Sequence, residues 1–342
     1  MRWLGRWLLR ATGPVVLVFL LVRVVDYGEL RDIVREIDIV WALLALAMVQ
    51  LLMLTRTYRW IDIHQLFGLP RASFGYQLRL SYATMLATLV LPQIVNPFSR
   101  FVLLLQDGYQ AKRAAPASVL EKLLDLVAFV TFGLYGSIVL ASTFGGLVWW
   151  AVGAIVLAIG LGLAAYAGRS YVGRLVAALL PKLPVVGGET ADSVLGAFRE
   201  LRALNAQAAA RMLAWSLVVA LVQATVLYFL ARSLHVDLSY PFMVAVWGVV
   251  ALTMLLPLSV NGIGTREAVL VVAFSAADRS TDAAVALGLM VLIVVAVGSS
   301  PGAIEWLRRF FVSRDPGVPA GTQETAPAAA SSPAHPQGEQ SR

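Results

Sequence analysis

Two short segments of the chain combine proline, asparagine and arginine in the same order. The first runs from Leu91 to Arg100 and the second from Leu256 to Arg266, and both read Leu-Pro-x-x-Val-Asn before a helix breaker and the arginine. Proline ends a helix because it lacks a backbone N–H. The free N–H groups at the start of the next half-helix favour an anion, and an arginine there adds a bidentate partner for phosphate or carboxylate.

These segments supply the candidate substrate-binding residues. They are Asn96 and Arg100 in the first segment and Asn261, Gly262, Gly264, Arg266 and Glu267 in the second, with Pro92 and Pro257 as the helix breaks. Paired breaks in corresponding positions of two oppositely oriented halves predict a transporter site near the membrane midplane. A chance match of common residues is the alternative. We favour a repeat, because position, topology and motif agree. For Arg266–Glu267 we favour a substrate-facing arginine braced by the glutamate over a purely structural ion pair.

A second charged group consists of Glu121, Lys122 and Asp125. The two carboxylates are four residues apart and share a helix face. Charges inside a membrane usually mark a functional role, such as ion coupling, or a structural pair. An interfacial helix start at Leu123 explains them equally well, with the carboxylates near the helix N-terminus and the lysine reaching the interface. Both interpretations stay open from the sequence.

Arg56 and Arg59 follow the second apolar run together with Tyr58 and Trp60. Positive residues on the cytoplasmic side and an aromatic belt at the interface account for this group. We therefore expect loop residues here rather than a head-group site.

The elements that position these residues are membrane helices. The chain has 342 residues, of which 59% are hydrophobic and only 14% charged, whereas soluble domains are about half apolar and a quarter charged. The net charge of +7 fits arginines held on the cytoplasmic side, and no basic stripe with exposed aromatics points to nucleic acid. The absence of cysteine and the scattered histidines predict no metal and no cofactor.

Six apolar runs are long enough to cross a bilayer. They are an uncleaved first span that ends at Val25, and Ile39–Leu54, Leu123–Ser142, Leu147–Gly168, Met212–Leu230 and Ala283–Ile304. Four shorter pieces, most of them interrupted by proline or glycine, are Leu80–Val95, Phe98–Leu105, Pro241–Leu256 and Ala268–Ala277. Lysine and arginine counts place both termini in the cytoplasm if each short pair returns to the side from which it entered.

The sequence thus predicts an all-α, polytopic transmembrane helical bundle, with about six full spans plus two re-entrant helical hairpins in inverted-repeat halves. The halves are residues 1–168 and 206–312, joined by a cytoplasmic amphipathic segment at 169–205. Residues 313–342 are rich in Pro, Ala, Ser, Gln and Gly and predict a disordered cytoplasmic tail.

At Leu256–Val269 the sequence resembles the transmembrane domain of lysylphosphatidylglycerol synthases, a flippase-like integral membrane family. The family shows a late Gly-x-Gly-x-Arg-Glu break, which begins here at Gly262. Pro92 and Arg100 match an earlier family motif, whose glycine and acid are missing here, so the role of that acid is not carried over. Glu121, Lys122 and Asp125 match a Glu-Arg-x-x-Asp pattern, with lysine replacing arginine. By pattern order, the resemblance covers residues 5–312.

The resemblance implies lipid translocation or service to lipid-linked substrates. We expect a flippase-like protein of a bacterial-type cytoplasmic membrane that holds an anionic phospholipid or polyprenyl phosphate between Arg100 and Arg266. No Walker-type loop is present, so movement would be downhill or coupled to ions through Glu121, Asp125 or Glu267. The synthases' soluble aminoacyl-transferase domain is not found in this sequence. Alternatives are an intramembrane transferase, a membrane partner of a separate lipid synthase or glycosyltransferase, and assembly as a homo-oligomer.

Overall fold

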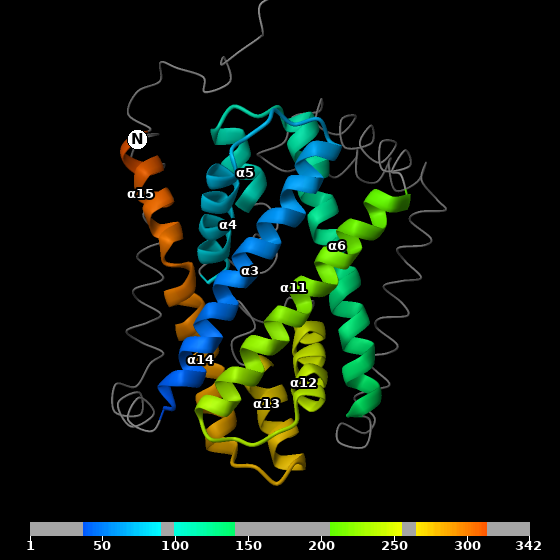
Figure 1. The fold of residues 1–342 in the computed structure, drawn as a ribbon, viewed down its shortest axis with the longest axis vertical. Coiled ribbons are helices and arrows are strands. Elements are labelled where there is room, and N and C mark those ends of the chain that lie inside the picture. Colours follow the sequence, from blue (N-terminus) through cyan, green and yellow to red (C-terminus); the bar gives the residue numbers. More distant parts are fainter. Residues whose placement is uncertain (1–36, 90–98, 141–205, 255–264, 313–342) are drawn as a thin grey trace, which may run out of the picture.

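The computed structural model describes residues 37–89, 99–140, 206–254 and 265–312. These residues are all-helical, which confirms the predicted polytopic helical bundle (Figure 1). The described helices are α3 (Ile39–Leu66), α4 (Phe74–Thr88), α5 (Ser99–Gln106), α6 (Ala111–Val139), α11 (Ala206–Ser233), α12 (Tyr240–Thr253), α13 (Thr265–Ala276), α14 (Thr281–Ser299) and α15 (Pro301–Val312).

Four of the described helices, α3, α6, α11 and α14, are long and apolar enough to cross a membrane. They coincide with four of the six predicted spans. The first predicted span and Leu147–Gly168 lie outside the described residues, as do the predicted amphipathic segment 169–205 and the predicted tail 313–342.

Three predicted span boundaries were wrong. Helix α3 continues to Leu66 instead of ending at Leu54, and α6 begins at Ala111, well before Leu123. Hydropathy locates the apolar stretch of a helix but not a polar extension of the same helix. The last predicted span divides into α14 and α15 at Ser300, where Pro301 follows and cannot donate the backbone hydrogen bond that would continue α14.

Local capping explains where several helices start. Asp38, Ser73 and Ser280 precede α3, α4 and α14, and each side chain accepts a hydrogen bond from a backbone N–H of the first turn. Such caps satisfy donors that the helix itself leaves free. The turn between α5 and α6 contains Gly108 at a φ of +82°, a left-handed conformation that glycine adopts without strain.

The short helices form two pairs that lie toward opposite ends of the bundle. Helices α4 and α5 lie near one end in Figure 1, and α12 and α13 lie near the other. Each pair falls between two long helices in the sequence, α3 and α6 for the first and α11 and α14 for the second. This arrangement is the one that inverted halves with a re-entrant hairpin in each would produce.

The helix contacts repeat in the same way. Helices α3 and α11 cross in the centre of the bundle and pack against each other (Figure 1). Helix α12 of the second half packs on α6 of the first, and α4 of the first half packs on α14 and α15 of the second. Small residues let the backbones approach in both places. A Cβ on Gly248 would lie 2.0 Å from the Phe132 carbonyl oxygen, and one on Gly302 would lie 2.4 Å from the Tyr82 carbonyl oxygen.

Candidate functional site: a buried cationic cluster

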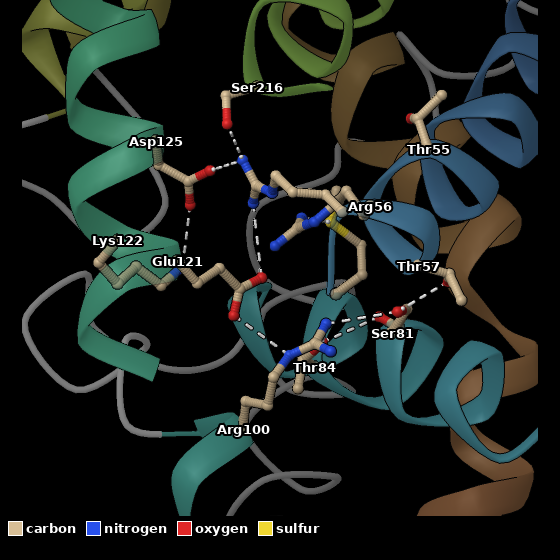
Figure 2. Close-up of polar contacts among 12 residues, drawn as sticks. Thr55, Arg56, Thr57, Ser81, Thr84, Arg100, Glu121, Lys122, Asp125 and Ser216 are labelled. Atoms are coloured by element: carbon tan, nitrogen blue, oxygen red, sulfur yellow. Dashed lines mark hydrogen bonds and ion pairs between the residues drawn. The ribbon is translucent and has the colours of Figure 1, made fainter. Parts of the chain in front are cut away.

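A cluster of buried charges forms where α3, α5 and α6 meet (Figure 2). Arg59 of α3 places Nη1 2.7 Å from Asp125 Oδ1 and Nη2 3.5 Å from Glu121 Oε1. Arg100 of α5 places Nε 3.2 Å from the other Glu121 oxygen, Oε2. The Glu121 carboxylate, on α6, therefore lies between two arginines from two other helices.

Polar and aromatic groups from α3, α4 and α11 complete the surroundings of the two arginines. Arg59 Nη1 donates to Ser216 Oγ at 3.1 Å. Arg100 Nη2 lies 3.3 Å from Ser81 Oγ and 3.4 Å from Thr84 Oγ1. The Arg100 guanidinium carbon also lies 4.5 Å from the centre of the Trp60 ring, a cation–π geometry. Four helices of the first half and α11 of the second thus hold the cluster in place.

Arg56 is a third buried guanidinium in the same region, one helical turn before Arg59 on α3. Its Nη1 donates to Met85 Sδ at 3.1 Å, and thioether sulfur is a weak acceptor. Among the described residues, no carboxylate lies within 4.0 Å of Arg56 to form an ion pair, whereas the neighbouring Arg59 and Arg100 both form such pairs.

Several guanidinium nitrogens in the cluster have no aligned hydrogen-bond acceptor among the described residues. They are Nε of Arg56, Nε and Nη2 of Arg59, and Nε and Nη1 of Arg100. Two of them, Arg59 Nη2 and Arg100 Nε, form ion pairs with Glu121 at 3.5 Å and 3.2 Å, which leaves Nε of Arg56, Nε of Arg59 and Nη1 of Arg100. Buried donors without acceptors are costly, and an anionic ligand would satisfy them.

The charge balance of the cluster is positive. Lys122 lies 3.2 Å from Asp125 at the more exposed edge, where the two side chains keep 31% and 19% of their surface, and Asp125 also pairs with Arg59 at 2.7 Å. The cluster sets four cations, Arg56, Arg59, Arg100 and Lys122, against the two carboxylates Glu121 and Asp125. The described side chains of the cluster therefore carry a net charge of +2, and unpaired charge inside a bundle is poorly solvated.

The structure decides the questions that the sequence left open for these residues. The expectation that Arg56 and Arg59 are loop residues was wrong, because α3 continues past them and buries both. Trp60 is fully buried under Arg100, so only the half-exposed Tyr58 fits an aromatic belt. Continued helical spacing was the available signal, since no Gly or Pro interrupts the sequence between Leu54 and Gly68.

The interfacial helix start proposed for Glu121, Lys122 and Asp125 was also wrong. Helix α6 begins at Ala111 and Glu121 lies well inside it, with 2% of its surface exposed. Glu121 and Asp125 therefore contact arginines rather than free N–H groups of a helix end. The predicted shared face of the two carboxylates is the face that meets Arg59.

In the second half, Arg266 and Glu267 form a close pair. Arg266 donates from Nε at 3.0 Å and from Nη2 at 2.6 Å to Glu267 Oε1, and the Arg266 side chain is buried. A Cβ on Gly288 of α14 would lie 2.7 Å from that same oxygen, so glycine makes room for the glutamate. The bracing part of the prediction matches this geometry, whereas the substrate-facing role remains a prediction.

The two arginines of the predicted repeat lie at corresponding places in the described chain. Arg100 lies in α5 and Arg266 in α13, the helices that follow the two predicted breaks. The remaining predicted residues, Pro92 and Asn96 in the first break and Pro257, Asn261, Gly262 and Gly264 in the second, lie outside the described residues.

A second polar network, which the sequence did not indicate, joins α15 to the α4–α5 pair. Arg309 lies in a bidentate pair with Asp107, at 2.8 Å and 2.7 Å, and its Nε donates to Glu305 at 3.0 Å. Arg79 adds a further contact to Glu305 at 3.4 Å, and the Tyr76 hydroxyl donates to Asp107. Burial, reinforced by the Asp107 carboxylate, raises the pKa of the Tyr76 phenol, so it stays a neutral donor.

The described residues contain no group of three side chains suited to hold a metal ion. The side chains of the cluster supply guanidinium groups, which bind an anion by charge and hydrogen bonds.

Comparison with known proteins gives one family. Residues 6–300 match the model of the family described as lysylphosphatidylglycerol synthase TM region. No curated protein matches the chain. The matched range includes both helix breaks, the buried cluster and the Arg266–Glu267 pair.

Proposed function

Because the chain belongs to the lysylphosphatidylglycerol synthase TM region family, an integral membrane family in lipid handling, we propose that it translocates an anionic lipid between the leaflets of a bacterial-type cytoplasmic membrane. Both termini face the cytoplasm in this proposal, in keeping with the arginines that flank the first and last predicted spans. The α4–α5 pair then enters from the cytoplasmic side and the α12–α13 pair from outside.

The buried cationic cluster is the observation that carries this proposal. A membrane bundle that buries three arginines against one fully buried carboxylate keeps guanidinium donors free for another partner. An anionic head group supplies the missing charge and acceptors, while its acyl chains stay in the bilayer. Arg100 of α5 contributes its buried guanidinium group, which can bind a phosphate through paired donors.

The repeat supports movement as well as binding. Inverted halves around a central site are the common basis of alternating access in transporters. Arg266, equivalent to Arg100, marks the second half's contact with the lipid, and Glu267 braces it. Glu121 and Asp125 form ion pairs with Arg59. In our proposal the lipid phosphate replaces these carboxylates as the partner of the arginine when the lipid binds, and the carboxylates return when it leaves.

Reconstitution tests the proposal. Purified protein is placed in liposomes with a tail-labelled fluorescent phosphatidylglycerol or phosphatidic acid, and dithionite quenching reports the fraction of label that reaches the outer leaflet. We expect scrambling by the wild type and strong loss in Arg100→Gln. Arg211→Gln is the matched control, because Arg211 is half-exposed and pairs with Asp62 outside the cluster.

Scrambling that is absent in the wild type for both lipids, or unchanged in folded Arg100→Gln, would overturn the proposal. Formation of a new lipid product from donor and acceptor lipids would assign the chain to an intramembrane transferase instead. Activity that requires a co-purified synthase or glycosyltransferase would assign it to a partner subunit.

A further inference from the structure

The ion pairs of the cluster do not explain why an arginine stands at position 56. Arg56 lies three residues before Arg59 on one helix, so two like charges lie on the same face of α3. Arg100 adds a third from α5, and Figure 2 shows Arg56 and Arg100 on either side of the Glu121 carboxylate. Like charges this close repel strongly away from water. A protein without a ligand for Arg56 would be expected to place an apolar residue there.

The net positive charge of the cluster determines how much negative charge its ligand should carry. With four cations, Lys122 included, and the two carboxylates Glu121 and Asp125, the described side chains of the cluster carry a net charge of +2. A phosphodiester lipid or a carboxylate carries a single negative charge and would leave one positive charge buried. A phosphate monoester carries about −1.5 to −2 at neutral pH and balances the cluster.

The donors also match a terminal phosphate. A monoester exposes three non-bridging oxygens, each of which accepts more than one hydrogen bond, whereas a phosphodiester exposes two. The unpartnered nitrogens come from three different arginines, and guanidinium groups bind phosphate through paired N–H donors. The hydroxyl oxygens of Ser81 and Thr84 accept from Arg100 Nη2 and hold its guanidinium in place.

We propose that this cluster selects ligands with a phosphate monoester group, and that Arg56 provides the selectivity over phosphodiesters. The inference rests on the proposed lipid-handling function and specifies its substrate class. Arg59 and Arg100 hold any anionic phosphate next to Glu121, and Arg56 binds the additional charged oxygen of the monoester.

Titration of the purified protein in a neutral detergent tests the assignment. Dioleoyl phosphatidic acid and dioleoyl phosphatidylglycerol have the same acyl chains, but the first carries a phosphate monoester and the second a phosphodiester. Binding of each lipid is followed by thermal shift and by tryptophan fluorescence. A charge-assisted contact predicts about 10- to 100-fold tighter binding of phosphatidic acid by the wild type. In Arg56→Met the two affinities should become equal, whereas Arg211→Met should keep the preference.

Two further arms complete the test. Inorganic phosphate and glycerol 3-phosphate compete with phosphatidic acid for the site and so distinguish a lipid ligand from a soluble ester. Competition only at a much higher concentration than phosphatidic acid assigns the site to a lipid monoester. Equal affinity assigns it to a soluble monoester. Arg56→Lys serves if Arg56→Met does not fold, and should keep a reduced preference, because lysine retains the charge without the paired donors.

Equal affinity for the two lipids in the wild type, or an unchanged preference in a folded Arg56 variant, would overturn the monoester assignment. Scrambling activity would then stand by itself. Conversely, a clear monoester preference without any scrambling would overturn the proposed translocation and leave the binding site.

Discussion

Replacement of Glu121 by glutamine offers a direct measure of the electrostatics of the cluster. Glutamine keeps the size of the side chain but removes the carboxylate that lies 3.5 Å from Arg59 and 3.2 Å from Arg100. The buried positive charge then has no counter-charge at the centre of the cluster. Removal of one partner of a buried ion pair costs about 3–5 kcal/mol, and Glu121 serves two arginines, so we expect the loss to lie in this range or above it.

Thermal unfolding of the detergent-purified protein measures this loss. The chain contains nine tryptophans, so intrinsic fluorescence reports unfolding without a label. In domains of about 150–250 residues, a loss of 1 kcal/mol lowers the Tm by about 2 °C or more. We therefore expect the Tm of Glu121→Gln to fall by about 6–10 °C. All variants are compared in ligand-free protein at one scan rate, because the unfolding of membrane proteins is often irreversible.

Two comparisons separate charge from packing. Asp62→Asn removes a carboxylate from the partly exposed Arg211 pair and should cost at most about 1 kcal/mol. Adding Arg56→Met to Glu121→Gln removes one of the uncompensated charges and should recover a large part of the loss. A Glu121→Gln protein that melts within about 2 °C of the wild type, or a double variant no more stable than Glu121→Gln, would refute the electrostatic account.

Three further predictions address other parts of the structure. Arg56→Met in ligand-free protein should raise the Tm, because replacing a buried, poorly paired charge by an apolar side chain stabilises by about 1–4 kcal/mol; a lower Tm would contradict this. Gly248→Ala should lower the Tm by the equivalent of about 1–3 kcal/mol, because its Cβ would meet a backbone oxygen at 2.0 Å, whereas Gly75→Ala meets nothing within 4 Å and should be neutral or stabilising. Asp107→Asn should weaken the contact with Arg309 and speed limited proteolysis at α15, and an unchanged rate would show that this pair does not hold the helix.

The bundle itself could be predicted because its signals are local. An apolar run of sufficient length defines a span, and Asp38, Ser73 and Ser280 are of residue types that favour a helix start. The two breaks were predicted for the same reason, since proline and glycine act on their own backbone, and their residues lie outside the described part of the chain. In the described part, α4 and α12 end before the predicted breaks, and long helices lie at four of the six predicted spans.

The charged residues were harder to assign because their environment is not local. The same arginine is a loop residue if its helix ends before it and a core residue if the helix continues, and hydropathy does not separate these cases. Arg59 illustrates the point: its partners are Glu121 and Asp125 on α6 and Ser216, which is 157 residues away in the sequence. The network at α15 likewise joins Asp107 to Arg309 across 202 residues.

By itself, the sequence determined that this chain forms an α-helical membrane protein with two interrupted segments that resemble each other, because length, apolarity and helix breaking depend on neighbouring residues. Only the tertiary structure decided that Arg56, Arg59 and Arg100 share one buried volume with Glu121. The reason is physical: the energy of a buried charge depends on the groups that surround it in space, and helix packing alone brings those groups together.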